Sequence, residues 1–407
     1  MALVLFYEAT TSRQALSVIP FLFEPGNIAF ALSHGQGFSS PLRTPTGPTA
    51  WMAPVYPLIL AAIFKLFGAY TFPAYLAAVL FNILCSALTC IPVFKAGQRI
   101  AGPSVAVTAA WLWAIFPNAI LLPVQSMWDT SLAALLAAVI LYRTITLTRN
   151  SGLRDWCLYG LLWGLTLMTN PTLVLLAPFL FGWLLWRTRV ISAFLLAVCI
   201  AALCCVPWAV RNYVVFGAFI PFRSVLGLQL WVGNNDRAID GRPGEVHPLS
   251  NSTERESYRR MGELAYMGAK RSEALHWIVT HPQVELHLTW VRFVETWTGG
   301  SPHPLRDLLH IDSIEFRAIL LFNLLVAAGT LVGLGFVLQT RNSYWFPLAM
   351  FPLLLPIPAY LTLSSARYRH PLDPAILLLT AIAIHRVRFV KSTVAQNSSF
   401  RKEPGNP

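Results

Sequence analysis

The chain has 407 residues, of which 56% are hydrophobic and only 12% are charged, and its mean hydropathy is +0.57. Soluble domains carry about 25% charged residues, so this composition excludes an ordinary water-soluble protein and indicates an integral membrane protein. The formal charge of +12 does not indicate nucleic-acid binding, because the basic excess lies in loops between apolar segments.

The acidic residues are concentrated in one segment. Residues 211–315 contain twelve acids and eleven bases, whereas six acids lie elsewhere: Glu8, Glu24, Asp129, Asp155, Asp373 and Glu403. We therefore predict one large water-facing segment at 211–315 in a chain that is otherwise embedded in the membrane. All six cysteines lie in apolar runs, which provides no disulfide framework.

The N-terminal part begins with two short apolar stretches. Residues 1–7 and 14–23 are too short to span a bilayer, which indicates either a truncated first helix, the interpretation we favour, or an N-terminus on the outer surface. Residues 13–54 then form a first outer loop. Residues 55–68 are apolar, short and followed directly by a longer run, which predicts an interfacial or re-entrant helix.

Seven apolar runs are long enough to cross about 30 Å of hydrocarbon. They are residues 72–97, 104–122, 128–148, 190–210, 316–339, 344–363 and 372–390. The stretch 155–187 is also apolar, but Thr169-Asn170-Pro171 interrupts it, so we predict two helices there, 155–168 and 171–187. The predicted fold class is an all-α integral membrane protein, a polytopic bundle of about nine or ten spans.

Orientation follows from the distribution of lysine and arginine among the short loops. Thirteen bases, including Lys95, Arg143 and Arg187, fall on one side, which is therefore predicted to be cytoplasmic. The first loop, the 123–128 turn, the 211–315 segment and residues 364–371 fall on the other side. This predicts a multi-pass protein of the inner (cytoplasmic) membrane whose functional side faces the periplasm or exterior. The predicted divisions are an N-terminal transmembrane region (1–210), an outer domain (211–315), C-terminal transmembrane helices (316–391) and a cytoplasmic tail (392–407).

Two of the rare carboxylates lie on the outer side. Glu24 is in the first loop, in FEPGNIAFALSHGQGF, and Asp129 opens a helix in QSMWDTSLAALL. Ionisable groups at the hydrocarbon boundary are costly unless they are paired or used, so both are candidate functional residues. The alternatives are an ion pair of Glu24 with Arg13 or Arg43, and an interaction of Asp129 with the positive end of its own helix.

Basic side chains on the same side are candidate ligands for phosphate. Arg367, Tyr368, Arg369 and His370 lie in the loop between the last two helices, and Arg211 follows an apolar helix. The donor fork of arginine matches the oxygens of a phosphate group. Contact with lipid headgroups is the alternative for each of them.

Short motifs occur in a set order along nearly the whole chain. They are Phe23-Glu24, Gly35-Gln36-Gly37-Phe38-Ser39, Pro54-Val55-Tyr56-Pro57-Leu58, Pro207-Trp208 with Arg211-Asn212-Tyr213, Gly233-Asn234-Asn235, His281-Pro282 and Arg367-Tyr368-Arg369-His370-Pro371. The ordered set resembles GT-C type polytopic glycosyltransferases, the family 39-like group related to protein O-mannosyltransferases and lipid A aminoarabinose transferases. The resemblance implies a GT-C-like helical bundle with a partly helical outer-face domain.

The resemblance also implies roles for individual residues. Glu24 occupies the position of the family's acidic residue at the glycosyl-transfer centre, and Asp129 that of a second acid after the next outer turn. Many relatives carry Asp, or an Asp-Glu pair, at the first position. Relatives often have Lys-Pro where this chain has Ala53-Pro54, so the corresponding phosphate contact is absent here or falls to Arg43 or Lys65.

The implied reaction transfers a sugar from a polyprenyl-phosphate donor, held in the membrane lipid, to an acceptor at the outer face. A carboxylate takes the proton of the acceptor hydroxyl, and arginine or a divalent metal stabilises the leaving phosphate. Glu24, Asp129 and His34 are the candidate metal ligands, but no HExxH motif marks a site. No GxxxxGK[ST] loop occurs, so no nucleotide cofactor is expected.

Two other classes of function remain open. One is a transporter or flippase for lipid-linked saccharides. Transporters more often show inverted repeats and polar residues at mid-membrane depth, whereas this sequence shows no clear internal repeat and most of its helix centres are apolar. The other is a non-catalytic scaffold derived from such an enzyme. The sequence identifies neither the sugar nor the acceptor, which could be a protein, a glycan or a lipid.

Overall fold

The computed structural model describes residues 19–125, 127–339 and 343–400, and side chains up to residue 387. The short apolar stretch at 1–7 and Arg13 lie outside these residues, as do the last residues of the predicted tail. The described chain is helical, and its one strand-like pairing is a bridge between Ser39 and Pro48. The predicted all-α membrane fold is thereby confirmed.

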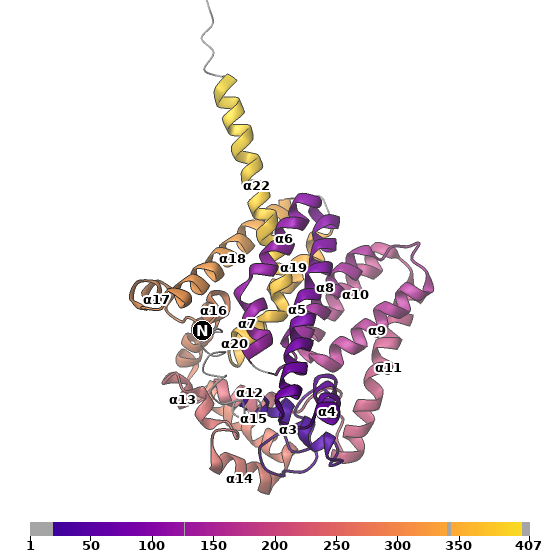
Figure 1. Ribbon diagram of the computed structural model, residues 1–407, viewed down its shortest axis with the longest axis vertical. Helices are drawn as coiled ribbons and strands as arrows, with labels where there is room; N and C mark the ends of the chain where they lie inside the picture. The colour runs from indigo at the N-terminus through magenta and orange to yellow at the C-terminus, as the bar shows by residue number, and fades with distance from the viewer. Residues whose placement is uncertain (1–18, 126, 340–342, 401–407) are drawn as a thin grey trace, which may run out of the picture.

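The N-terminal half contains most of the bundle (Figure 1). Its elements are η1 (Ile19–Phe21), α3 (Glu24–Ser33), α4 (Val55–Phe67), α5 (Phe72–Ala101), α6 (Pro103–Ile115), α7 (Pro117–Gln125), α8 (Thr130–Thr146), α9 (Leu153–Thr169), η2 (Pro171–Leu176), α10 (Ala177–Thr188) and α11 (Ile191–Phe216). The predicted short helix before the first long one is α4, which ends at Gly68.

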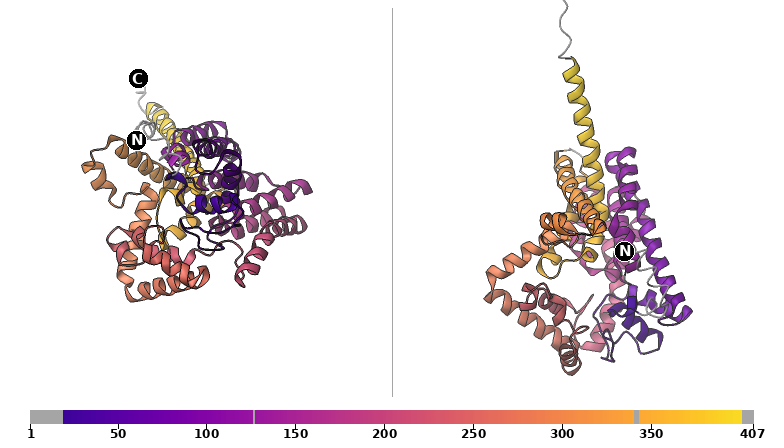
Figure 2. Two further views of the ribbon diagram at one scale, coloured as in Figure 1. Left: turned by 60° about the horizontal axis from the view of Figure 1, so that its bottom comes forward. Right: turned by 60° about the vertical axis from the view of Figure 1, so that its left-hand side comes forward.

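The second half comprises residues 211–315, called the outer segment after the side on which they are predicted to lie, and the last membrane helices. Its elements are α12 (Leu226–Gly233), α13 (Asp236–Ile239), η3 (Pro243–Val246), α14 (Ser252–Met261), α15 (Glu263–Thr280), α16 (Pro282–Thr298), α17 (Pro304–His310), α18 (Ile314–Gln339), α19 (Trp345–Leu354), α20 (Ile357–Leu361), α21 (Ala366–Arg369), η4 (His370–Leu372) and α22 (Asp373–Phe400). Figures 1 and 2 show the outer helices α12–α15 beside α3 and α4, at the end of the bundle opposite to the protruding α22.

Five helical segments of the described chain are long and apolar enough to cross a membrane. They are Phe72–Ala101, Pro103–Gln125, Pro171–Thr188, Ile191–Phe216 and Ile314–Gln339. Shorter apolar helices occur at Val55–Phe67, Thr130–Thr146 and Trp345–Leu361. Proline accounts for part of the difference from the predicted runs, because it cannot donate a backbone hydrogen bond and interrupts a helix.

The outward faces of the long helices are apolar. Leu80 and Leu84 on α5, Leu203 and Val214 on α11, and Leu331 on α18 are each more than half exposed. Such a surface is unusual for a water-soluble monomer and is what a lipid environment favours. Between helices, small residues permit close approach: a Cβ on Gly164 of α9 would lie 2.4 Å from Cys204 Cβ of α11.

The cytoplasmic end predicted from the basic loops is held together by cation–π contacts. The guanidinium groups of Arg99, at the end of α5, and Arg187, at the end of α10, lie 5.8 and 4.6 Å from the ring centre of Tyr344. Arg187 also donates a hydrogen bond of 2.9 Å to the Tyr344 hydroxyl. Two loops that the sequence assigns to one side are thus neighbours in the structure.

At the opposite end, the outer segment is fastened to the first loop by Glu263. Its carboxylate accepts hydrogen bonds from Thr49 Oγ1, from the Ala50 backbone N–H at 2.7 Å and from Ser224 Oγ at 2.7 Å. Tyr258 donates a further one at 2.7 Å. A buried carboxylate is tolerated when its oxygens are hydrogen-bonded, so this cluster fixes the register between segments far apart in the chain.

Candidate functional site

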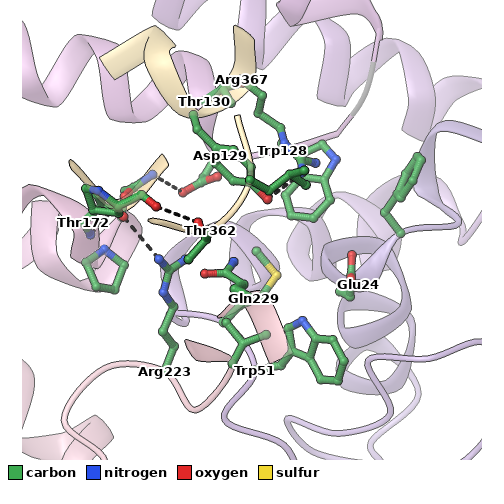
Figure 3. A pocket seen from close by; sticks show the side chains of 18 of the residues that line it. Glu24, Trp51, Trp128, Asp129, Thr130, Thr172, Arg223, Gln229, Thr362 and Arg367 are labelled. Atoms are coloured by element: carbon green, nitrogen blue, oxygen red, sulfur yellow. Dashed lines mark hydrogen bonds between the residues drawn. The ribbon is translucent and has the colours of Figure 1, made fainter. Parts of the chain in front are cut away.

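A cavity of about 360 Å³ lies at the end of the bundle on which the predicted outer segment packs (Figure 3). It is enclosed by the first loop, the start of α8, the α9–η2 break, the outer segment and the residues before α22. Its polar and aromatic wall residues include Glu24, Arg43, Trp51, Trp128, Asp129, Asn170, Thr172, Arg223, Gln229, His247, Thr362, Arg367 and Tyr368. Its apolar wall includes Met52, Leu173, Leu228, Val232, Leu355 and Leu363.

Asp129 lies at the N-terminal end of α8 and is held from the interrupted segment that the sequence contains at Asn170-Pro171. The Asn170 side-chain amide donates a hydrogen bond of 3.1 Å to Asp129 Oδ2. Asn170 Oδ1 meanwhile accepts the Thr172 backbone N–H at 3.2 Å and so caps η2. The break between α9 and η2 therefore has its polar groups satisfied at the cavity wall, as an interruption near hydrocarbon requires.

Two arginines from different parts of the chain flank Asp129 (Figure 3). Arg223, in the outer segment, donates a hydrogen bond of 3.2 Å to Thr172 Oγ1. Arg367 lies with its guanidinium 3.9 Å from the ring centre of Trp128 and donates to the Tyr368 hydroxyl at 3.1 Å. Neither arginine has a direct ion pair in the described chain, so both keep donors that can meet an anion.

The electrostatics of this group reflect its enclosure. Burial raises the pKa of the Asp129 carboxyl, and the positive charges of Arg223 and Arg367 act in the opposite direction. Burial likewise lowers the pKa of the Arg223 guanidinium, which Asp129 partly offsets. A second anion entering the cavity would therefore meet two arginines that one carboxylate incompletely neutralises.

Glu24 is the first residue of α3 and is 5% exposed. Its Oε1 lies 3.4 Å from His247 Nε2, whereas its buried Oε2 has no hydrogen-bond partner among the described residues. Gly26 allows η1 to fold against the start of α3, because a Cβ there would lie 2.0 Å from the Phe21 carbonyl oxygen. A tight turn thus places in the cavity wall a carboxylate with one buried oxygen that lacks a hydrogen-bond partner among the described residues. Arg43, a predicted ion-pair partner of Glu24, instead donates to the Leu22 carbonyl oxygen at 3.4 Å.

Three residues predicted to bind substrate lie away from the cavity. Arg369 is 3% exposed and pairs with Asp373 at 2.9 Å, and it also donates to the Thr296 carbonyl oxygen at 3.0 Å. His370 is buried and bonds to Asp373 at 2.9 Å. The expected loop at 364–371 contains helix α21, and residues two apart on a helix point to opposite sides, so Arg367 and Arg369 diverge.

Arg211 is the third of these residues. It lies within α11, which continues to Phe216, and it donates to the carbonyl oxygens of Thr49 at 2.6 Å and Phe38 at 2.7 Å. Its guanidinium also lies against the Trp208 ring at 5.1 Å from the ring centre. We therefore assign Arg211, Arg369 and His370 to the scaffold around the site and not to its wall.

Sequence reasoning missed Arg223, His247 and Asn170 as site residues. Arg223 and His247 belong to a segment with many charged residues, where no local pattern distinguishes them. Asn170 did carry a signal, since it interrupts an apolar run on the same predicted side as Asp129. Glu24, Asp129, Arg43, Arg367 and Tyr368 all line the cavity.

The cavity wall offers few ligands for a divalent metal. Among its wall residues the ionisable metal-binding types are Glu24, Asp129 and His247, and within the described chain no three His, Cys, Asp or Glu side chains come close enough to hold an ion together. His34 bonds to the Phe30 carbonyl oxygen at 2.9 Å and is not part of the wall. The described residues do not by themselves form a metal centre.

The apolar helical bundle has a GT-C-like fold, similar to that of solved oligosaccharyltransferases. Residues 51–210 match the family described as dolichyl-phosphate-mannose-protein mannosyltransferase. The family match and the similar fold both support the resemblance that the sequence motifs indicated. None of the curated proteins matches the chain in sequence.

Solved structures give the similarity of fold. The archaeal oligosaccharyltransferase AglB from Archaeoglobus fulgidus, in complex with an inhibitory peptide and a dolichol-phosphate, aligns at 15% identity and a TM-score of 0.52 over 95% of this chain and 48% of that chain. The apo form of the oligosaccharyltransferase from the same organism aligns at 13% identity and 0.50, over 93% and 48%. ArnT from Cupriavidus metallidurans bound to undecaprenyl phosphate aligns at 13% and 0.39, over 94% and 78%. The chain spans about half the length of the archaeal enzymes.

Proposed function

We propose that this protein transfers a sugar from a polyprenyl-phosphate donor to an acceptor hydroxyl at the outer face of the membrane. The observation that carries the proposal is one cavity whose wall combines the Glu24 carboxylate with the incompletely neutralised pair Arg223 and Arg367. The similar fold of AglB, solved with a dolichol-phosphate, supports a donor of this class. The family matched by residues 51–210 supports sugar transfer from such a lipid.

In the proposed reaction, Glu24 acts as the general base. The Glu24 carboxylate accepts the proton of the acceptor hydroxyl while the hydroxyl oxygen forms a bond to the anomeric carbon of the sugar. The bond from the anomeric carbon to the phosphate oxygen breaks, and its electron pair leaves with the phosphate. Arg223 and Arg367 offset the charge that develops on that oxygen, and Asp129 keeps the two guanidinium groups at the cavity wall.

The apolar part of the wall suits the lipid tail of the donor. Leu355, Pro358, Ala359 and Leu363 line the cavity at the interruption between α19 and α20 and just beyond it. This side connects the charged wall to the apolar segment Trp345–Leu361. We propose that the phosphate enters from the hydrocarbon along this side, with the isoprenoid chain remaining in the bilayer.

The proposal places the site on the outer face of the inner membrane, following the basic-loop orientation. A single cysteine at Glu256, which is exposed on α14, tests this placement. In a background without native cysteines, a membrane-impermeant maleimide should label Glu256→Cys in intact cells. Labelling that requires cell lysis would contradict the orientation.

The transfer itself is tested with purified protein in vesicles that contain a radiolabelled polyprenyl-phosphate sugar and a panel of hydroxyl acceptors. Wild-type protein should transfer label, and Glu24→Gln should lower kcat by about 10²–10⁴-fold, the usual contribution of general base catalysis. The control is Glu256→Gln, which changes an exposed outer carboxylate. Movement of the donor across the bilayer without transfer would instead identify a flippase, and wild-type turnover by Glu24→Gln would refute the assigned base.

A further inference from the structure

His247 brings the outer segment into contact with Glu24. It follows η3 and lines the cavity with its ring, and its Nε2 lies 3.4 Å from Glu24 Oε1. The two side chains are only 22% and 6% exposed. They belong to elements far apart in the chain, so the contact exists only when the outer segment is docked on the first loop.

The hydrogen bonds of the ring determine its tautomer. The Leu249 backbone N–H donates to His247 Nδ1 at 3.2 Å. A backbone N–H can only donate, so Nδ1 is an acceptor and the neutral ring carries its hydrogen on Nε2. That hydrogen is on the nitrogen nearest to Glu24 Oε1. The Trp51 ring, 5.8 Å away between centres and at 70°, packs edge-on against the imidazole.

The surroundings keep the ring neutral. Burial lowers the pKa of His247; Glu24 opposes this effect, and Arg367 adds to it. The other charged side chains of the cavity wall are Arg43, Asp129 and Arg223. A proton on Nδ1 would also be unfavourable, because the Leu249 N–H donates to that nitrogen and two N–H donors would then face each other.

We propose that His247 is a positioning residue for the base: its Nε2–H donates to Glu24 Oε1 and fixes the orientation of the carboxylate. The inference rests on the proposed role of Glu24 and adds the atom that fixes its orientation. It agrees with the unequal environments of the two carboxylate oxygens, one facing His247 and one without a partner among the described residues. Catalytic side chains need such support to stay in a productive geometry.

Steady-state transfer in vesicles tests the kinetic consequence. His247→Ala should lower kcat by about 10–100-fold, the range expected for a hydrogen bond to a charged group, with the donor KM unchanged. His247→Gln, which retains a side-chain N–H donor, should recover part of kcat.

The matched control is His276→Ala, which removes an exposed histidine of the same segment. A His247→Ala variant whose kcat equals that of wild type would overturn the inference. A rise in donor KM alone would overturn it too, since it would assign His247 to donor binding.

A double-mutant cycle tests the pairing without any catalytic readout. Melting temperatures are measured in detergent at pH 7.5 for wild type, Glu24→Gln, His247→Ala and the double variant, with no donor or acceptor present. Paired residues give a loss in the double variant that is smaller than the sum of the single losses. Additive losses overturn the pairing. A non-additive cycle together with a wild-type protein that transfers no sugar would support the pairing and refute the proposed function alone.

Discussion

Asn170 donates a hydrogen bond of 3.1 Å to Asp129, and this bond joins the interrupted segment after α9 to the first residue before α8. The helix break and the rare carboxylate are therefore parts of one arrangement. An apolar residue at 170 would leave the Asp129 oxygen without this donor and η2 without its cap. The positions of Arg223 and Arg367 around Asp129 depend on that arrangement.

The first prediction concerns this bond. Asn170→Ala should lower kcat/KM for the donor by about 10–100-fold, the range for a lost hydrogen bond to a charged group. The measurement is initial-rate transfer in vesicles over a range of donor concentrations. Asn251→Ala is the control, because Asn251 caps α14 in the same way but lies outside the cavity wall. Equal effects of the two substitutions would show that Asn170 acts only as a helix cap.

The second prediction concerns the arginine pair. Arg223→Lys and Arg367→Lys keep the positive charge but remove the planar donor fork, so each should raise the donor KM by about tenfold or more, with a smaller change in kcat. Arg260→Lys, on the exposed face of α14, is the matched control and should change neither. Unaltered donor KM in the Arg223→Lys, Arg367→Lys double variant would exclude the pair as phosphate ligands.

The parts of this site that could be predicted from sequence are those whose signal is local. Glu24 and Asp129 stand out because carboxylates are scarce outside residues 211–315, and the apolar runs predict the helical bundle. Arg223 and His247 reach the cavity only through docking of the outer segment, which Glu263 fastens to the first loop. No property of the sequence near either residue reports that long-range contact.

Arg367 and Arg369 show a second reason why the sequence did not fully predict the site. Two arginines in one short loop predicted a common phosphate ligand. Helix α21 turns them to different sides, so that Arg367 reaches the cavity and Arg369 enters the bundle. One turn of helix, too short to show a hydrophobic period, decides which arginine belongs to the site.

The third prediction follows from this separation. Arg369→Ala should destabilise the protein by about 3–5 kcal/mol, because it leaves the buried Asp373 carboxylate without its cationic partner. Arg367→Ala should cost far less stability, since Arg367 has no ion pair among the described residues. Thermal unfolding in detergent compares the two variants. A similar loss for both would contradict the division into a scaffold arginine and a site arginine.

The fourth prediction is the dependence of stability on pH that His247 introduces. Burial, with a further contribution from Arg367, lowers the pKa of His247 below its ordinary value of 6.5, against the opposing effect of Glu24. Above pH 6.5 the ring is neutral in both the folded and the unfolded chain, so it contributes no pH dependence. As the pH falls below 6.5, the unfolded chain takes up a proton that the folded protein resists, and the free energy of unfolding decreases until the folded pKa is reached.

The melting temperature of wild-type protein should therefore decline between pH 6.5 and 5, and His247→Gln should flatten that decline because glutamine does not titrate. The two proteins are compared by thermal unfolding in detergent at half-unit steps from pH 7.5 to 5. His276→Gln serves as the control, since it replaces an exposed histidine of the same segment that lies outside the cavity wall. A His247→Gln curve parallel to wild type would mean that the ring takes up its proton as readily in the folded protein as in the unfolded chain. The neutral, hydrogen-donating state of His247 at the cavity wall would then be refuted.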